Sequence, residues 1–197
     1  MGLEKQGSRP TGLIGIIIGR LMNKFQTILY IEYFKNCLPP DNSILLDIGC
    51  GGGKFLRYLS AMNDSYLLFG LDHSLEMVKL SKKTNQKAIE QKRLKIIQGS
   101  VTDLSFEESM FDVVTAFETV QFWPDIDKSF FEIGRLLKSD GFFLIINRYP
   151  AEESKWWKKV KIKSDKDYKD KLEKARFGQV TIDLNYKPGW IVVKATK

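Results

Sequence analysis

The sequence predicts an α/β fold, in which a doubly wound and mostly parallel sheet of seven strands ends in an antiparallel C-terminal hairpin. Over residues 43–146, short apolar runs of strand length alternate with longer amphipathic stretches of helix length, as repeated βαβ units require. The short runs are almost continuously apolar, which is typical of parallel strands covered by helices on both faces. At 197 residues, with 43% hydrophobic and 28% charged residues, the chain has the size and composition of one globular domain.

Five strands and three helices are predicted within this region. The predicted strands span residues 44–48, 66–71, 94–98, 112–117 and 142–146. The predicted helices span residues 53–62, 75–92 and 126–137, where apolar residues recur at helical spacing.

Local signals mark several element boundaries. Ser74 precedes the second helix and is placed to cap it, without a complete capping box. Asp125 is placed to cap the third helix, after Pro124 ends the preceding segment. Residues 138–141 are expected to close that helix and turn the chain into the next strand, with Gly141 free to adopt a positive φ.

An N-terminal helical cap is predicted over residues 1–42. It contains one or two helices over residues 20–37, and Pro39-Pro40 separates them from the first strand. Residues 43–197 form the predicted main part of a chain that we expect to be a single domain.

The C-terminal part is predicted to contain one helix and a hairpin. Ser164 is placed to cap a helix over residues 165–175. Two strands over residues 179–184 and 190–195 surround Lys187-Pro188-Gly189, and a hairpin is their simplest arrangement.

The net charge of +7 is concentrated in one segment. Residues 155–176 hold ten Lys or Arg against four Asp or Glu, so the rest of the chain sums to nearly neutral. A protein that follows a nucleic-acid backbone usually carries basic residues along a whole face. We therefore interpret the segment first as a solvated helix face with a basic loop.

Cysteine, histidine and hydropathy patterns exclude several classes of protein. Cys37 and Cys50 are the only cysteines and His73 is the only histidine, so neither a disulfide framework nor a zinc site can be assembled, and no metal is expected. The apolar run over residues 13–18 is far shorter than the ~20 residues that cross a bilayer. We expect a cytoplasmic protein without a secretory signal or membrane contact.

A glycine-rich loop follows the first predicted strand, with the sequence Asp47-Ile48-Gly49-Cys50-Gly51-Gly52-Gly53-Lys54. A backbone with few β-carbons turns sharply and lets a ligand approach, and the helix that follows offers unpaired N–H donors. The second strand leads into Asp72, whose carboxylate can accept two hydrogen bonds from a ribose diol. The two features predict a site for a ribose-containing ligand.

The loop spacing separates two families that use such a site. Dinucleotide-binding proteins carry G-x-G-x-x-G, but the third glycine position, counted from Gly49, is Lys54. The tight G-x-G-x-G with Asp47 upstream instead resembles the first motif of class I S-adenosylmethionine-dependent methyltransferases. The resemblance implies a Rossmann-like fold and S-adenosylmethionine as cofactor. It places Asp47 and the loop residues Gly49, Cys50, Gly51 and Gly53 around the methionine part and the ribose, with Asp72 on the ribose diol.

The resemblance extends over residues 43–147. Residues 96–106, IIQGSVTDLSF, are similar to the family's third segment, which flanks the adenine with Ser100 and Val101; many relatives have Asp where this chain has Ser100. Residues 111–125, FDVVTAFETVQFWPD, resemble the fourth strand and its exit loop. The resemblance also implies that His73 lies against the adenosine and that Phe117 contributes to the cofactor pocket.

Candidate acceptor-site residues follow the fourth strand. Glu118 is placed at the carboxyl end of that strand, where ligands of open α/β sheets bind, and is the candidate general base. Its alternative role is that of a loop carboxylate that pairs with a nearby arginine or orders the ammonium group of the cofactor. The candidate walls of the acceptor cavity are Gln121, Phe122, Trp123 and Tyr149, with plain packing as the alternative for the aromatic residues. The segment lacks the N-P-P-[YF] box of enzymes that methylate base amines or a glutamine amide.

Four functions remain open on the sequence. The favoured one is methyl transfer to a small-molecule acceptor, with the oligomeric state undetermined. The second is methylation of RNA or another polyanion, in which Trp156, Trp157 and the lysines of residues 155–176 would bind the substrate. The third is a cofactor-binding module without catalysis, and the fourth, least favoured, is a nicotinamide oxidoreductase.

Overall fold

The computed structural model describes residues 27–149, 151–152, 154, 157–158 and 160–197. These residues form two compact units, the first ending at Ser100 and the second beginning at Val101. Of the predicted cap over residues 1–42, residues 1–26 lie outside the described residues. In the basic segment, Lys155, Trp156 and Lys159 also lie outside them.

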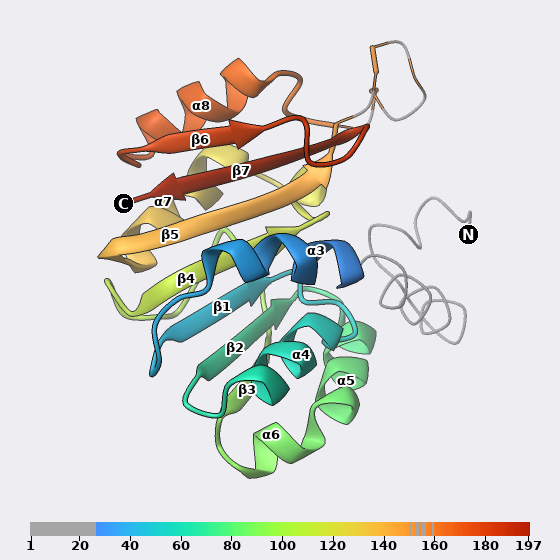
Figure 1. Ribbon diagram of the computed structural model, residues 1–197, viewed down its shortest axis with the longest axis vertical. Helices are drawn as coiled ribbons and strands as arrows, with labels where there is room; N and C mark the ends of the chain where they lie inside the picture. Colours follow the sequence, from blue (N-terminus) through green and yellow to red (C-terminus); the bar gives the residue numbers. More distant parts are fainter. Residues whose placement is uncertain (1–26, 150, 153, 155–156, 159) are drawn as a thin grey trace. The chain divides into compact units, whose positions relative to one another are not determined.

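Three parallel strands of the first unit run in the order β3-β2-β1 (Figure 1). They are β1 Ile44–Ile48, β2 Leu67–Asp72 and β3 Leu94–Gln98. The register pairs Asp47 with Gly70 and Asp72 with Gln98. Because the strands are parallel, their carboxyl ends share one edge, and the glycine-rich loop leaves β1 at that edge.

The helices of the first unit pack through apolar faces. They are α3 Thr27–Phe34, the 3-10 helix η1 Lys35–Cys37, α4 Lys54–Met62, α5 Leu75–Thr84 and α6 Gln86–Glu90. Helix α4 buries Phe55, Leu56 and Leu59, and the Phe55 ring meets Phe34 of α3 edge to face at 5.3 Å. This packing fixes the helix that begins directly after the glycine-rich loop.

The helix predicted over residues 75–92 is wrong as a single element, because the chain breaks it at Asn85. The backbone of Asn85 has φ −116° and ψ 20°, and α6 begins directly after it. Its buried side-chain Nδ2 donates to the carbonyl oxygens of Gly53 and Ser81, both at 2.9 Å. Asn85 therefore ties α5 to the start of α4. The regular helix is interrupted at Asn85, a residue type of low helical preference, where these side-chain bonds form.

Ser74 occupies the capping position of α5 as predicted, but its side chain makes no capping bond there. Its backbone N–H instead donates to Asp72 Oδ1 at 2.9 Å. The start of α5 is therefore tied to the last residue of β2.

The second unit has strands in the order β4-β5-β7-β6. Its elements are β4 Phe111–Phe117, the 3-10 helix η2 Val120–Phe122, α7 Ile126–Leu136, β5 Leu137–Arg148, α8 Asp165–Lys174, β6 Val180–Asp183 and β7 Trp190–Thr196. Strands β4 and β5 are parallel, whereas β7 is antiparallel to both β5 and β6. The predicted fold class, a mostly parallel seven-stranded α/β sheet with an antiparallel C-terminal hairpin, is confirmed.

The predicted turn over residues 138–141 is part of β5 instead. Strand β5 begins at Leu137, directly after α7, and its register with β4 shifts between Phe111 and Val113. Gly141 does not adopt a positive φ, contrary to the prediction. A Cβ at Gly141 would lie 3.0 Å from the carbonyl oxygens of Phe111 and Asp112, so the glycine permits close backbone approach at the irregular pairing.

The predicted helix caps of the second unit are confirmed. Asp125 Oδ1 accepts from the N–H of Lys128 at 3.0 Å at the start of α7. At α8, Ser164 Oγ accepts from the N–H of Asp167 and the Asp167 carboxylate accepts from the N–H of Ser164, which forms a full capping box. Within the described part of the chain, no helix has the length and apolar character needed to cross a membrane.

Candidate cofactor and active site

The glycine-rich loop depends on residues that tolerate left-handed backbone. Gly49, Gly51 and Gly53 have φ of 74°, 52° and 75°, a region that costs other residues roughly 1–2 kcal/mol each. The N–H groups of Gly49 and Cys50 both donate to the carbonyl oxygen of Leu71, at 2.7 and 3.0 Å. The loop is therefore fastened to the end of β2, and Gly53 directly precedes α4.

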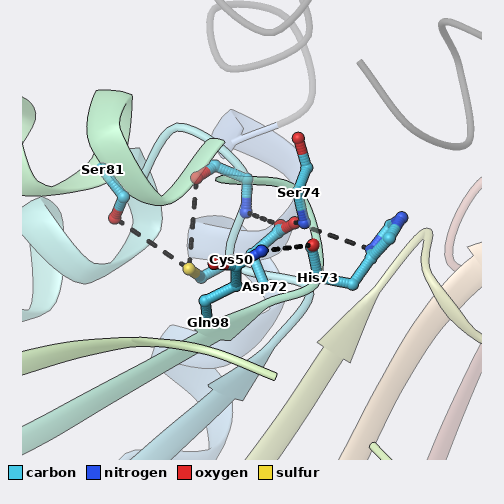
Figure 2. A network of polar contacts seen from close by, with 7 residues as sticks. Cys50, Asp72, His73, Ser74, Ser81 and Gln98 are labelled. Atoms are coloured by element: carbon cyan, nitrogen blue, oxygen red, sulfur yellow. Dashed lines mark hydrogen bonds and ion pairs between the residues drawn. The ribbon is translucent and has the colours of Figure 1, made fainter. Parts of the chain in front are cut away.

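Asp72 holds the loop through its buried carboxylate (Figure 2). Oδ2 accepts from the N–H of Gly51 and Oδ1 accepts from the N–H of Ser74, both at 2.9 Å. Burial raises the pKa of Asp72, and these two N–H groups oppose the rise. Because a carboxylate has about four acceptor positions, Asp72 retains capacity for ligand hydroxyl groups while the backbone fixes its orientation.

His73 follows Asp72 and lies at the surface, its side chain 49% exposed. Its Nδ1 is 3.7 Å from Asp72 Oδ1, and its carbonyl oxygen accepts from Gln98 Nε2 at 3.3 Å. Figure 2 shows His73, Asp72 and Gln98 meeting at the shared strand edge. Contact of His73 with adenosine remains a prediction.

The backbone of Cys50 belongs to the glycine-rich loop, and its N–H helps to fasten the loop to β2. Its side chain is buried, with Sγ 3.9 Å from Ser81 Oγ of α5, and a Cβ at Gly70 would approach Sγ to 3.0 Å. Burial is the largest cause that raises the pKa of the Cys50 thiol, followed by the charges of Asp72 and Asp47. The neutral thiol thus packs beneath the loop, and Asp47 is also buried, near the end of β1.

The first unit thus brings Asp47, Gly49, Gly51, Gly53 and Asp72 together. The loop backbone lacks β-carbons, the acid at the end of β2 is held as an acceptor, and Ser100 is partly exposed at the end of this unit. These residues fit a cofactor with a ribose diol. Asp72 would accept from the diol, and the loop would lie against the methionine part.

The second unit places Glu118 at the carboxyl end of β4 in a left-handed conformation, with φ 56°. Its N–H donates to the carbonyl oxygen of Ile146 at 2.8 Å, and Gln121 Nε2 donates to the carbonyl oxygen of Glu118 at 2.7 Å. Phe117 and Val101 are buried. Such a conformation in a bulky residue is maintained by its surroundings, and it is common at functional sites.

Arg148, the last residue of β5, pairs with the buried Glu118 carboxylate. The distance from Arg148 Nε to Glu118 Oε1 is 3.2 Å, and the Arg148 guanidinium lies 5.2 Å from the centre of the Trp190 ring. Burial raises the pKa of Glu118, and the charge of Arg148 partly opposes the rise. The ion pair is the alternative anticipated for Glu118, and Arg148 itself was not predicted as a site residue.

Replacing Glu118 with Gln is expected to change the pH dependence of stability. Because the pKa of Glu118 is raised from 4.5, the folded chain keeps this proton at pH values where the unfolded chain has lost it. The free energy of unfolding therefore falls as the pH rises from 4.5, the ordinary pKa of a glutamate, to the raised pKa of Glu118 in the folded chain. The decrease is at most about 1.4 kcal/mol per pH unit.

In Glu118→Gln this loss is absent, so its unfolding free energy should rise relative to the wild type across that window. Urea denaturation of both proteins between roughly pH 4 and pH 8 measures the difference. A difference that stays constant with pH would contradict the assignment.

The other candidate acceptor residues differ in their surroundings. Trp123 is buried, stacks on Phe143 at 6.4 Å and meets Phe130 edge to face at 6.1 Å, as expected for packing. Gln121 and Tyr149 are partly exposed, and the N–H of Tyr149 donates to the carbonyl oxygen of Gly189. Gln121 and Tyr149 therefore remain the better candidates for acceptor contact.

The fold and the glycine-rich loop together define a class I, Rossmann-like methyltransferase architecture. A family model described as "Methyltransferase domain" matches residues 46–145, and the chain belongs to this family. The predicted class is confirmed, and S-adenosylmethionine is the cofactor of that class.

The chain spans about half the length of the curated relatives that it matches. It is 31% identical over 110 residues to the uncharacterized methyltransferase YcgJ of Bacillus subtilis, covering 55% of this chain and 42% of that protein. It is 30% identical over 162 residues to an uncharacterized protein of Methanocaldococcus jannaschii, covering 81% of this chain and 57% of that protein.

Solved structures show the same fold. A chain from a complex of the Haloferax volcanii Trm112 methyltransferase activator has a TM-score of 0.78 and 20% identity, with 90% of this chain and 92% of that chain covered. A SAM-dependent methyltransferase from Aquifex aeolicus has a TM-score of 0.74 and 19% identity, with 91% and 97% covered.

Proposed function

We propose that the chain transfers the methyl group of S-adenosylmethionine to a small organic molecule. The buried Asp72 carboxylate carries the proposal, since the N–H groups of Gly51 and Ser74 hold it beside a loop that glycines keep open. When bound, the cofactor supplies an electrophilic methyl group on a positively charged sulfonium. The chain then has to bind and orient the partners, an effect that can supply about 7–11 kcal/mol of the barrier.

Glu118 is the proposed general base for an acceptor that is protonated at neutral pH. Its raised pKa brings its basicity closer to the working range of such a group, and Arg148 holds the carboxylate in place. Under this proposal Arg148 is a positioning residue. Gln121, whose amide binds the backbone of Glu118, and the partly exposed Tyr149 would contact the acceptor.

An apolar acceptor is favoured by two observations. Phe122, next to Gln121, is 40% exposed although it is a large aromatic residue. Among the relatives are a fatty-acid O-methyltransferase of Mycolicibacterium smegmatis, 27% identical over 116 residues, and a demethylmenaquinone methyltransferase of Lactobacillus johnsonii, 31% identical over 111 residues. The acceptors that these two names state are a fatty acid and demethylmenaquinone.

Contacts within the basic segment disfavour the polyanion alternative. Lys161 Nζ donates to the carbonyl oxygen of Trp123, and Lys171 Nζ lies 2.7 Å from Asp127 Oδ1. Lys163 Nζ donates to the carbonyl oxygen of Trp157 and lies 5.0 Å from the centre of its ring. These groups are engaged by the chain itself, which supports a basic surface loop and helix rather than a stacking platform.

Methyl transfer from S-adenosylmethionine with a radioactive methyl group tests the proposal. The purified chain is incubated with fatty acids, quinols and phosphorylated amines, and in parallel with total RNA and protein. We expect label in an organic extract of a small-molecule reaction, and at least about tenfold less with Glu118→Gln. Label that enters RNA or protein, with none in the small-molecule fractions, would overturn the proposed acceptor class.

A further inference from the structure

A cavity lined by positive charge lies within the first unit. Its volume is about 460 Å³, and it is bounded by the second half of α4, the junction of α5 and α6, and the segment that enters β3. Its charged lining residues are the exposed Arg57, Lys83 and Lys87 and the partly exposed Arg93, and none of the described residues that line it is Asp or Glu. None of the predicted cofactor or acceptor residues belongs to this cavity.

The sequence around the cavity is a second concentration of basic residues. Residues 79–95 contain seven Lys or Arg and one acid, Glu90. The chain outside residues 155–176 is nearly neutral in sum, because acidic residues elsewhere balance the positive charge of residues 79–95. Glu90 Oε1 accepts from Gln86 Nε2 at 2.8 Å, so the single acid of the segment is bound to an amide that lines the cavity.

Arg93 is held at the cavity by neutral groups. Its Nη1 donates to the carbonyl oxygen of Ser60 at 3.2 Å, and its Nη2 donates to Gln91 Oε1 at 2.8 Å. Among the residues that the structure describes, no carboxylate forms an ion pair with Arg57, Lys83, Lys87 or Arg93. Neutral partners orient the guanidinium, and no acid of the described residues forms an ion pair that would compensate its charge or that of the two lysines.

The chemistry of the lining defines the ligand. Guanidinium and ammonium groups are the usual protein partners of phosphate oxygens. Gln86 adds an amide with a second N–H beside the one that donates to Glu90, whereas the hydroxyl groups of Ser60 and Thr84 already donate to the carbonyl oxygens of Arg57 and Leu80. Four cations around one cavity repel one another, so a ligand with several negative charges relieves more repulsion than a single anion does. The volume lies within the range of small-molecule sites, about 300–1,000 Å³.

We propose that this cavity is a second binding site, for a ligand that carries two or more phosphate groups. The site is separate from the glycine-rich loop and from Asp72, and its occupation does not require methyl transfer. Free polyphosphate compounds and the backbone of a nucleic acid both supply such groups, and the experiment below distinguishes them.

Calorimetric titration of the full chain with inorganic tripolyphosphate, at roughly 50 mM salt, tests the site. The cavity variant is Lys83→Ala/Lys87→Ala, and the matched control is Lys82→Ala/Lys95→Ala. The control removes the same charge from two lysines of the same segment that are exposed, as Lys83 and Lys87 are, but that do not line the cavity.

We expect saturable binding by the wild type, binding at least about tenfold weaker in the cavity variant, and a change of less than about twofold in the control. No saturable binding by the wild type, or equal weakening in both variants, would overturn the proposal.

A parallel titration with a single-stranded RNA of about 20 nucleotides distinguishes the two sources. RNA that binds more tightly than tripolyphosphate, and loses affinity in the cavity variant alone, supports the site and identifies backbone phosphates as its ligand. RNA that binds all three proteins equally, while tripolyphosphate discriminates among them, supports the site and identifies a small phosphate compound.

Discussion

Asp72→Ala is expected to weaken S-adenosylmethionine binding by about 100-fold or more. Hydrogen bonds to a charged group contribute about 1.5–3 kcal/mol each, and the proposed contact with the ribose diol contains two. The substitution also removes the partner of the Gly51 N–H, which holds the glycine-rich loop against the end of β2. Isothermal titration of S-adenosylmethionine into the wild type and the variant measures the ratio of dissociation constants.

Asp64→Ala is the matched control for this loss. Asp64 is an exposed acid in the same unit, in the turn before β2, so its removal changes the net charge by the same amount. We expect its dissociation constant to stay within about twofold of the wild type. Equal affinity of Asp72→Ala and Asp64→Ala would show that the carboxylate at the end of β2 does not hold the cofactor.

Gly53→Ala is expected to reduce the unfolding free energy by about 3 kcal/mol or more. Gly53 has φ 75°, and a Cβ built there would lie 2.2 Å from Ser81 Oγ and 2.4 Å from Asn85 Nδ2. Ser81 and Asn85 are buried, and Asn85 is bound to the carbonyl oxygen of Gly53. The methyl group therefore adds a steric conflict to the cost of left-handed backbone.

Gly189→Ala separates these two costs. Gly189 has the same φ of 75°, but a Cβ there would meet nothing within 4 Å. Its substitution should cost only the conformational strain, about 1–2 kcal/mol. Urea denaturation of both variants at one pH gives the comparison, and equal destabilisation would contradict the close packing of Gly53 against α5.

The sequence predicts the strands well where their patterns are unambiguous. The bounds of β1 and β3 agree with the prediction, because short and mainly apolar runs are bounded there by glycine or polar residues. The caps at Asp125 and Ser164 were also predictable, since a capping side chain acts within three residues of its own position.

Features that depend on tertiary contact were not predictable from local pattern. The break at Asn85 accompanies bonds to Gly53, which is 32 residues away in the chain. Gly141 is needed for its approach to the carbonyl oxygens of β4 rather than for a positive φ. Periodicity contains neither kind of information, because it describes only neighbours along one element.

The candidate site shows the same division. The glycine spacing and Asp72 were evident from the sequence, whereas the bonds from Gly51 and Ser74 to Asp72 required the fold. Arg148 lies 30 residues from Glu118, and nothing local pairs them. One signal in the sequence would have suggested this ion pair. Arg148 ends the strand next in the sequence after β4, the strand that Glu118 follows.

Titration of the isotopically labelled full chain with S-adenosylhomocysteine, followed by NMR of the backbone amides, tests the cofactor site most directly. We expect saturable shifts of the Gly49, Gly51 and Ser74 amides that are lost in Asp72→Ala and retained in Asp64→Ala. The absence of saturable shifts at these amides, or identical shifts in Asp72→Ala, would contradict cofactor binding between the glycine-rich loop and Asp72.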